Sequence, residues 1–201
     1  MMRRLRKDWV ESLLLIVTKM AKINLKETIV IPDGIEITID PLSLKASGPN
    51  GTLDRKYFYP GLKLTKEGNI LSLEYTNASK KEKMVLKTLK AHIENMLMGT
   101  KRDFVYSLKI CSGHFPMTVT QEGNKIIIKN FLGEKVSRSA KILENVKVEI
   151  NKDVITLSGF DIEAVGQSAA NLEKSTRITN RDRRRFQDGI YITNKAGEKE
   201  E

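Results

Sequence analysis

The segment ILSLEYTN, Ile70–Asn77, is the most informative part of the chain, because its pattern occurs twice. Apolar residues alternate with polar ones as far as Tyr75, which predicts a strand with one buried face. The segment VITLS, Val154–Ser158, repeats this pattern, and the Asp161 that follows it lies 161 − 77 = 84 residues after Asn77. A strand-rich unit that recurs along a chain predicts two similar lobes rather than one large core.

Turn sequences ahead of these strands repeat as well. GPNG, Gly48–Gly51, is rich in turn-forming residues, and its Asn-Gly pair supplies the positive φ angles that a tight hairpin needs. NFLGEK, Asn130–Lys135, is predicted to form a second loop around Gly133, which lies 133 − 51 = 82 residues after Gly51. We therefore predict an α+β fold of two tandem duplicated lobes, each an antiparallel sheet with one amphipathic helix packed on one face.

A helical pattern follows each of the repeated strands. The first helix is predicted from about Ala78 to Gly99, where the glycine would end it in a left-handed conformation. The second is predicted to begin after Asp161 as its N-cap. The expected buried faces consist of Leu86, Leu89, Ile93 and Leu97 in the first helix, and of Ile162, Val165, Ala169, Leu172 and Thr176 in the second.

The chain is expected to divide into four parts. These are an N-terminal extension at residues 1–19, lobe one at 20–100, lobe two at 101–192, and a polar C-terminal tail at 193–201. The extension combines arginines with the short apolar run Leu13–Val17, as a mitochondrial presequence or a weak signal peptide does. The run is short for a signal peptide, and Asp8 and Glu11 are unusual in a presequence. We therefore interpret these residues as an extension ahead of a natural start at Met20.

The composition indicates a folded protein with a basic surface. The 201 residues include 35 Lys and Arg against 25 Asp and Glu, which gives a formal net charge of +10. The apolar fraction of 40% is enough to bury a core, which excludes disorder throughout the chain. An excess of positive charge is typical of proteins that bind nucleic acid or an anionic surface. No apolar run approaches the roughly 20 residues that a membrane-spanning helix needs.

Few residues could carry out catalysis or bind a metal. Cys111 is the one cysteine, which excludes an internal disulfide and favours an intracellular compartment, and its place in an alternating pattern predicts a small buried residue. Together with the two histidines, His92 and His114, it cannot form a structural zinc site of the usual kind. The sequence has no glycine-rich phosphate loop and no catalytic constellation. We therefore expect no metal, no cofactor and no catalytic residue.

The run TRITNRDRRRF, Thr176–Phe186, is the strongest functional signal. It contains five arginines and a single acid, Asp182. Guanidinium groups suit contact with phosphates, and Phe186 and Tyr191 add aromatic surface. RNA is favoured over DNA, because the chain has no recognition-helix or zinc-finger pattern. The candidate RNA-binding residues are His114, Lys129, Lys135, Arg138, Arg177, Arg181, Arg183, Arg184, Arg185 and Tyr191.

Several motifs in the same order resemble one known family. The motifs are Gly48–Leu53, His92–Gly99 leading into Phe104 and Tyr106, His114–Pro116, Asn130–Lys135, Gly159–Glu163 continuing into Ser168–Ala170, and Phe186–Tyr191. They resemble the large-subunit ribosomal protein L-six family in its eukaryotic cytosolic form, called L-nine. The resemblance covers residues 20–193, and it depends on the motifs together rather than on any one of them.

The resemblance implies a two-lobed structural protein of the cytoplasmic ribosome that is not an enzyme. It implies that the second lobe binds large-subunit ribosomal RNA beside the sarcin–ricin loop, near the place where translational GTPases dock. It also implies that the first lobe points toward the stalk base and neighbouring large-subunit proteins. The tip around Gly133, Lys135 and Arg138 and the segment Arg177–Arg185 are then expected to face the RNA.

Two alternatives remain open from the sequence. One is a basic RNA-binding or RNA-processing protein outside the ribosome. An enzyme of that kind would need convergent acids or a metal site, and no spacing in the chain supplies one. The other is an organellar version of the ribosomal protein, which depends entirely on the role of residues 1–19.

Overall fold

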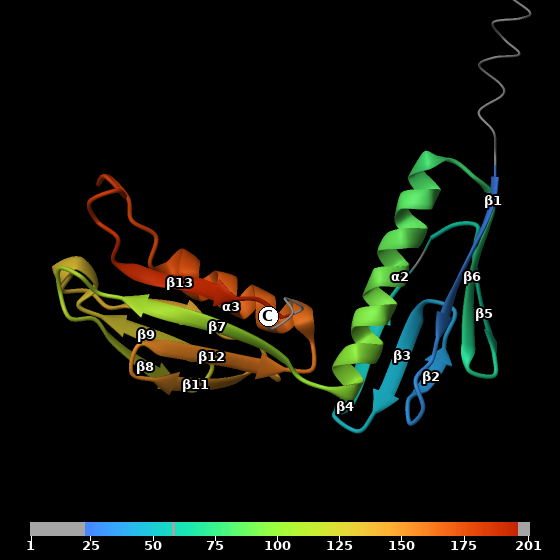
Figure 1. Cartoon of the computed structure of the whole chain (residues 1–201), viewed down its shortest axis with the longest axis horizontal. Coiled ribbons are helices and arrows are strands. Elements are labelled where there is room, and N and C mark those ends of the chain that lie inside the picture. The colour runs from blue at the N-terminus through green and yellow to red at the C-terminus, as the bar shows by residue number, and fades with distance from the viewer. Residues whose placement is uncertain (1–22, 58, 197–201) are drawn as a thin grey trace, which may run out of the picture. The chain divides into compact units, whose positions relative to one another are not determined.

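A computed structural model describes residues 23–57 and 59–196, which form two compact units (Figure 1). Unit 1 comprises residues 23–46 and 54–97, and unit 2 comprises residues 47–53 and 98–196. The expectations for residues 1–19 lie outside the described residues. The expected boundary between lobes at residue 100 stays a prediction.

Unit 1 contains six strands and a long helix. In chain order these are β1 (Ile23–Val30), β2 (Glu36–Ile39), β3 (Ser43–Gly48), β4 (Gly51–Lys56), β5 (Leu62–Glu67), β6 (Ile70–Ala78) and α2 (Lys80–Lys101). The β3–β4 turn and the last turn of α2 are assigned to unit 2. The strands form two sheets, with the orders β1-β6-β5 and β2-β3-β4.

Unit 2 repeats this order of elements and extends it. Its elements are β7 (Phe104–Cys111), β8 (Thr118–Glu122), β9 (Lys125–Lys129), the 3-10 helix η1 (Phe131–Gly133), β10 (Arg138–Lys141), β11 (Lys147–Asn151), β12 (Val154–Gly159), α3 (Ile162–Ser175) and β13 (Gly189–Asn194). The sheets have the orders β11-β12-β7-β13 and β10-β9-β8. β7 to β12 and α3 therefore correspond one to one with β1 to β6 and α2, and β13 is the added strand.

The predicted α+β class and the duplication are confirmed. β1 pairs antiparallel with β6 as β7 pairs with β12, and β12 begins 154 − 70 = 84 residues after β6. Most of the predicted helix faces are also confirmed. Leu86, Leu89, Ile93 and Leu97 of α2 are buried, as are Val165, Ala169, Leu172 and Thr176 of α3 and its C-cap, whereas Ile162 is only half-buried. α3 contacts β7, β10, β12 and β13, so its apolar face closes the core of unit 2.

Each helix begins with a side chain that caps its first turn. The carboxylate of Asp161 accepts a hydrogen bond from the backbone N–H of Glu163 at 2.9 Å, so the predicted N-cap of α3 is confirmed. At the start of α2, Glu82 accepts hydrogen bonds from the backbone N–H and the hydroxyl of Ser79. This Ser-x-x-Glu arrangement is a capping box. It sets the start of the helix at Lys80, two residues later than predicted.

The predicted end of the first helix at Gly99 is wrong. α2 continues to Lys101, and Gly99 lies inside it without a left-handed backbone. The glycine is needed for close packing instead. A Cβ built at Gly99 would lie 2.0 Å from the carbonyl oxygen of Phe160 and 3.0 Å from the ring of Phe104.

Two further features differ from the expectations. β13 was not expected as a strand at all. Cys111, expected to be buried, is half-buried. In the part of the chain that the structure describes, no helix is long and apolar enough to span a membrane.

Candidate RNA-binding interface

Five exposed arginines lie in the loop between α3 and β13, which we call the arginine loop (residues 177–187). Buried residues hold both of its ends. Ile178 packs into the core of unit 2 at 7% exposure, and the backbone N–H of Ile190 donates to the Thr176 hydroxyl at 3.0 Å. The loop is therefore anchored at both ends, while its arginine side chains remain in solvent.

The single acid of the run, Asp182, forms a turn within the arginine loop. Its carbonyl oxygen accepts the N–H groups of Arg185 at 3.1 Å and Phe186 at 3.0 Å, and its carboxylate accepts the N–H of Arg184 at 2.9 Å. The backbone N–H and the guanidinium of Arg184 lower the pKa of Asp182. Arg184 is thereby paired. Among the described residues, the guanidinium groups of Arg177, Arg183 and Arg185 have no hydrogen-bond or ion-pair partner.

A buried carboxylate, Asp188, ties the arginine loop to the β7–β8 loop (residues 112–117). Its Oδ1 accepts the N–H groups of Gly113 at 2.5 Å and His114 at 2.9 Å, and its Oδ2 accepts Nδ1–H of the His114 ring at 2.5 Å. Burial raises the pKa of Asp188, but the hydrogen bonds from His114 and Gly113 outweigh it, so the net pKa is lowered. Asp188 is therefore held as a carboxylate.

Aromatic contacts extend this link into the arginine loop. The His114 ring stacks on the Phe186 ring, with centroids 4.8 Å apart and planes 28° apart. The Arg181 guanidinium lies 5.0 Å from the centroid of the same Phe186 ring. A cation over an aromatic ring is attracted by the negative face of its π-system. Asp188, His114, Phe186 and Arg181 thus form one connected chain of contacts from the core to the surface.

The η1 tip, residues 130–137, packs against the other side of the β7–β8 loop. Phe131 is buried, and Asn130 and Leu132 have positive φ angles of 59° and 49°. The Asn130 side-chain amide donates to the carbonyl oxygen of Pro116 at 2.9 Å. The predicted loop around Gly133 is therefore a fixed tip.

Arg138 connects the η1 tip with the start of the arginine loop. Its guanidinium donates to both carboxylate oxygens of Glu134 at 2.6 and 2.8 Å, and to the carbonyl oxygens of Ser175 at 2.9 Å and Arg177 at 3.1 Å. It also lies 4.3 Å from the centroid of the Phe131 ring. The hydrogen bond from Arg138 is the main cause of a lowered pKa of Glu134. Contact of Arg138 with RNA stays a prediction, and within the fold this side chain joins two loops.

Replacing Arg138 by alanine is expected to lower the free energy of unfolding by about 2 kcal/mol, because two carbonyl oxygens and the Glu134 carboxylate lose a charged donor. Lys135→Ala in the same tip is the matched control. It removes an exposed cation and is expected to change stability by less than about 0.5 kcal/mol. Urea denaturation of both variants measures the difference. Equal stabilities would contradict a bridging role for Arg138.

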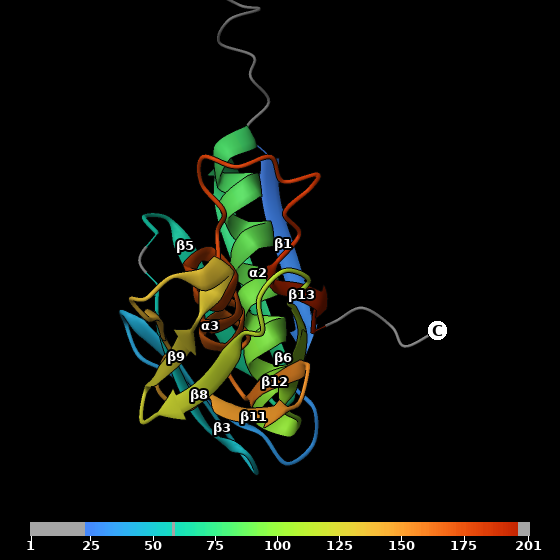
Figure 2. The same cartoon turned by 90° about the vertical axis from the view of Figure 1, so that its left-hand side faces the viewer.

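The structure brings most of the predicted site residues to one end of unit 2. The arginine loop, the β7–β8 loop and the η1 tip meet there (Figure 1), and Figure 2 shows this end facing the viewer. Lys129, Lys135 and His114 are exposed. Tyr191 is half-buried in β13, where its hydroxyl donates to the carbonyl oxygen of Asp188 at 3.3 Å and burial raises its pKa.

The sequence did not point to Asp188. The sequence does show an isolated acid directly before the apolar run Gly189–Ile192. A carboxylate at the start of a buried strand needs hydrogen-bonding partners, so this position could have been recognised as structurally important. The partners themselves lie 74 and 75 residues earlier, at His114 and Gly113. No local pattern links positions so far apart.

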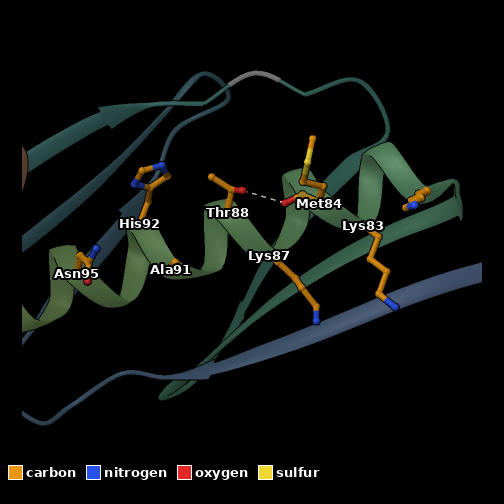
Figure 3. Close-up of a pocket in the computed structure, with 8 residues that line it drawn as sticks. Lys83, Met84, Lys87, Thr88, Ala91, His92 and Asn95 are labelled. Carbon is orange, nitrogen blue, oxygen red and sulfur yellow. Dashed lines mark hydrogen bonds between the residues drawn. The ribbon is translucent and has the colours of Figure 1, made fainter.

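Unit 1 has an open groove of about 610 Å³ along α2. Its lining residues are Lys80, Lys83, Met84, Lys87, Thr88, Ala91, His92 and Asn95. Figure 3 shows Met84, Thr88 and His92 on one side of the helix, while Lys83 and Lys87 extend away from them. The Thr88 hydroxyl donates to the carbonyl oxygen of Met84 at 2.9 Å. No Asp or Glu is among the described residues that line the groove.

Comparison with known proteins identifies the family. The family described as Ribosomal protein L6 matches residues 115–189, from the β7–β8 loop to the start of β13. The Large ribosomal subunit protein uL6 of Methanobrevibacter smithii is 43% identical over 171 residues, which cover 85% of this chain and 96% of that protein. The chain belongs to the ribosomal protein L6 family. The resemblance found in the sequence motifs is thereby confirmed.

Other members of the ribosomal protein L6 family align over similar lengths. The uL6 protein of Sulfurisphaera tokodaii is 42% identical over 88% of this chain and 95% of its own length. That of Methanosarcina mazei is 40% identical over 86% of this chain and 98% of its own length. Ribosomal protein L6 is a structural protein and not an enzyme. The RNA-processing enzyme considered from the sequence is therefore set aside.

Proposed function

We propose that the chain is a structural constituent of the large ribosomal subunit and binds its ribosomal RNA through the end of unit 2. The observation that carries this proposal is the arginine loop, which is anchored at both ends and holds three exposed guanidinium groups that have no hydrogen-bond or ion-pair partner among residues 23–57 and 59–196. An anchored loop loses little conformational entropy when its arginines bind phosphates. Family membership supports the ribosomal assignment, and a ribosomal role places the chain in the cytoplasm.

The mechanism that we propose is neutralisation of phosphate charge combined with a fit of shape. The η1 tip and the β7–β8 loop hold the arginine loop in one position through Arg138, His114 and Asp188. The arginines of this loop then contact phosphates across a folded RNA surface, as expected for recognition by shape. No covalent bond is made or broken.

The binding position within the subunit is the finer part of the proposal. We place the end of unit 2 beside the sarcin–ricin loop, near the docking region of translational GTPases, with unit 1 toward neighbouring proteins at the stalk base. The family resemblance supports this position. Hydroxyl-radical footprinting of reconstituted large subunits is expected to show protection beside the sarcin–ricin loop, and protection confined to distant helices would contradict it.

The arginine loop itself is tested by Arg177→Ala combined with Arg183→Ala. The double variant is expected to keep the fold and to bind large-subunit ribosomal RNA more weakly. Each phosphate contact that is lost should lower the slope of log affinity against log salt by roughly 0.7–0.9. Filter binding at a series of salt concentrations measures this slope.

The matched control removes two lysines from the same unit. Lys125 begins β9 and Lys147 begins β11, so Lys125→Ala with Lys147→Ala causes the same loss of charge outside the three loops. This control is expected to retain most of the wild-type salt slope. If both double variants lose the same slope, charge alone explains binding and the arginine loop is not the interface.

A further inference from the structure

A hollow of about 360 Å³ lies between the β7–β8 loop and the arginine loop. Its lining residues are Cys111, Ser112, Gly113, His114, Arg185, Gln187 and Asp188. The volume falls within the range of small-ligand pockets, which starts at about 300 Å³. The hollow therefore has room for one small planar group inside the proposed RNA-binding surface.

Three kinds of group surround this hollow. Arg185 contributes a guanidinium without a hydrogen-bond or ion-pair partner among the described residues. Gln187 contributes a side-chain amide, which donates a long hydrogen bond of 3.4 Å to the carbonyl oxygen of Arg184. His114 contributes an aromatic ring that is covered by Phe186 on one face, while 43% of its side chain remains exposed.

Asp188 lines the hollow as a carboxylate whose two oxygens are both hydrogen-bonded. Its side chain is 4% exposed, and both of its oxygens accept hydrogen bonds from Gly113 or His114. Asp188 is thus a positioning residue, because it fixes the histidine ring at the wall of the hollow. The guanidinium of Arg185, which is exposed at the hollow, can contact a phosphate there.

We propose that the hollow receives one unpaired nucleotide of the bound ribosomal RNA. The base stacks on the exposed face of His114 and hydrogen-bonds with the amide of Gln187, while its phosphate contacts Arg185. Proteins read folded RNA largely through such unstacked bases, which they hold between ring faces and hydrogen-bonding side chains. This inference rests on the proposed RNA-binding function and adds a site that reads a base.

Gly113 offers a way to fill the hollow without changing any charge. A Cβ at this position would find only Asp188 Oδ1 within 4 Å, at 3.8 Å, which is ordinary contact. The backbone of Gly113 has no positive φ, so an L-residue is compatible with it. Its N–H would still donate to Asp188 after substitution. Gly113→Leu is therefore expected to fold and to occupy space that the base needs.

The experiment measures binding of the full chain to large-subunit ribosomal RNA at several salt concentrations. Gly113→Leu and Gln187→Ala are each expected to weaken binding about 10-fold and to leave the salt slope unchanged, because stacking and neutral hydrogen bonds release no counterions. Arg185→Ala is expected to lower the slope by roughly 0.7–0.9. Gln121→Leu, which adds a leucine at an exposed neutral position of β8, is the matched control and should bind like the wild type.

Chemical probing of the RNA gives an independent readout. One nucleotide is expected to be protected on its Watson–Crick edge in the wild-type complex and reactive in the Gly113→Leu complex. Wild-type affinity of both Gly113→Leu and Gln187→Ala, with normal circular dichroism, would overturn the nucleotide site and leave the proposed function intact. If Gly113→Leu does not fold, Gln187→Ala and the probing decide. Absence of salt-dependent RNA binding by the wild type would instead overturn the proposed function.

Discussion

Gly99→Ala is expected to lower the free energy of unfolding by at least about 3 kcal/mol, because the added methyl group cannot be placed without moving backbone. The new Cβ would lie 2.0 Å from the carbonyl oxygen of Phe160 and 3.0 Å from the Phe104 ring. Overpacking of a close contact costs typically 1–3 kcal/mol, and more where backbone must move. Chemical denaturation followed by circular dichroism measures the loss.

Gly166→Ala is the matched control for this substitution. Gly166 also lies within a helix, α3. A Cβ there would lie 3.4 Å from the Tyr106 hydroxyl oxygen, which is the far end of a side chain and not backbone. Alanine in a helix interior is favoured over glycine by roughly 0.5–1 kcal/mol. The two substitutions are therefore expected to have opposite signs. Equal effects would mean that helix propensity, and not the contact with Phe160, explains Gly99.

Asp188→Ala is expected to destabilise the chain by about 3 kcal/mol. The N–H groups of Gly113 and His114 lose their charged acceptor, and a hydrogen bond to a charged group contributes about 1.5–3 kcal/mol. The His114 ring also loses the bond that orients it against Phe186, so RNA binding should weaken with stability. Thermal unfolding and RNA filter binding of the same samples test both effects.

Two controls separate the buried carboxylate from charge in general. Asp188→Asn keeps an oxygen that can accept from the backbone, and it should lose less stability than Asp188→Ala. Asp153→Ala removes an exposed acid from the turn before β12 and should change stability by less than about 0.5 kcal/mol. Destabilisation by Asp153→Ala equal to that of Asp188→Ala would contradict the role of the buried bonds.

The stability that Asp188 contributes is expected to depend on pH in one direction. Its folded-state pKa lies below the usual 3.8, so near that pH the unfolded chain binds more protons than the folded one. The contribution is therefore complete above about pH 4 and is lost as the pH falls through the folded-state pKa. The free energies of unfolding of the wild type and of Asp188→Ala should differ most at pH 7, and the difference should shrink as the pH falls through the folded-state pKa. A difference that persists unchanged at pH 2 would contradict this.

Local patterns predicted much of the fold. The alternation in Ile70–Tyr75 and Val154–Ser158 and the helical spacing that follows both strands were sufficient for the duplicated α+β class, because these signals lie within one element. Gly99 shows where a local pattern is ambiguous. A glycine that ends a helix and a glycine that admits a neighbouring backbone look the same in a sequence.

The candidate site was predictable in charge but not in geometry. The cluster of arginines is evident in the sequence, and the exposure of all five side chains agrees with its interpretation as a binding surface. The bonds that shape it join residues far apart, as Asp188 does with Gly113 and His114 and as Arg138 does with Ser175. Arg138 illustrates the difference. The sequence suggested a cation that is free to bind RNA, whereas in the fold its guanidinium joins the η1 tip to the start of the arginine loop. Such roles depend on tertiary contacts that no single segment encodes.

The added strand β13 also determines when the arginine loop can close during synthesis of the chain. It pairs with β7, whose register places Gly189 opposite Cys111, so the arginine loop is closed only after residues near 190 have left the translating ribosome. A nascent chain that ends earlier would carry all five arginines without the strand that closes their loop. We therefore expect assembly into new subunits to select completed chains, and a chain truncated after Gln187 to compete poorly with the full-length protein during reconstitution.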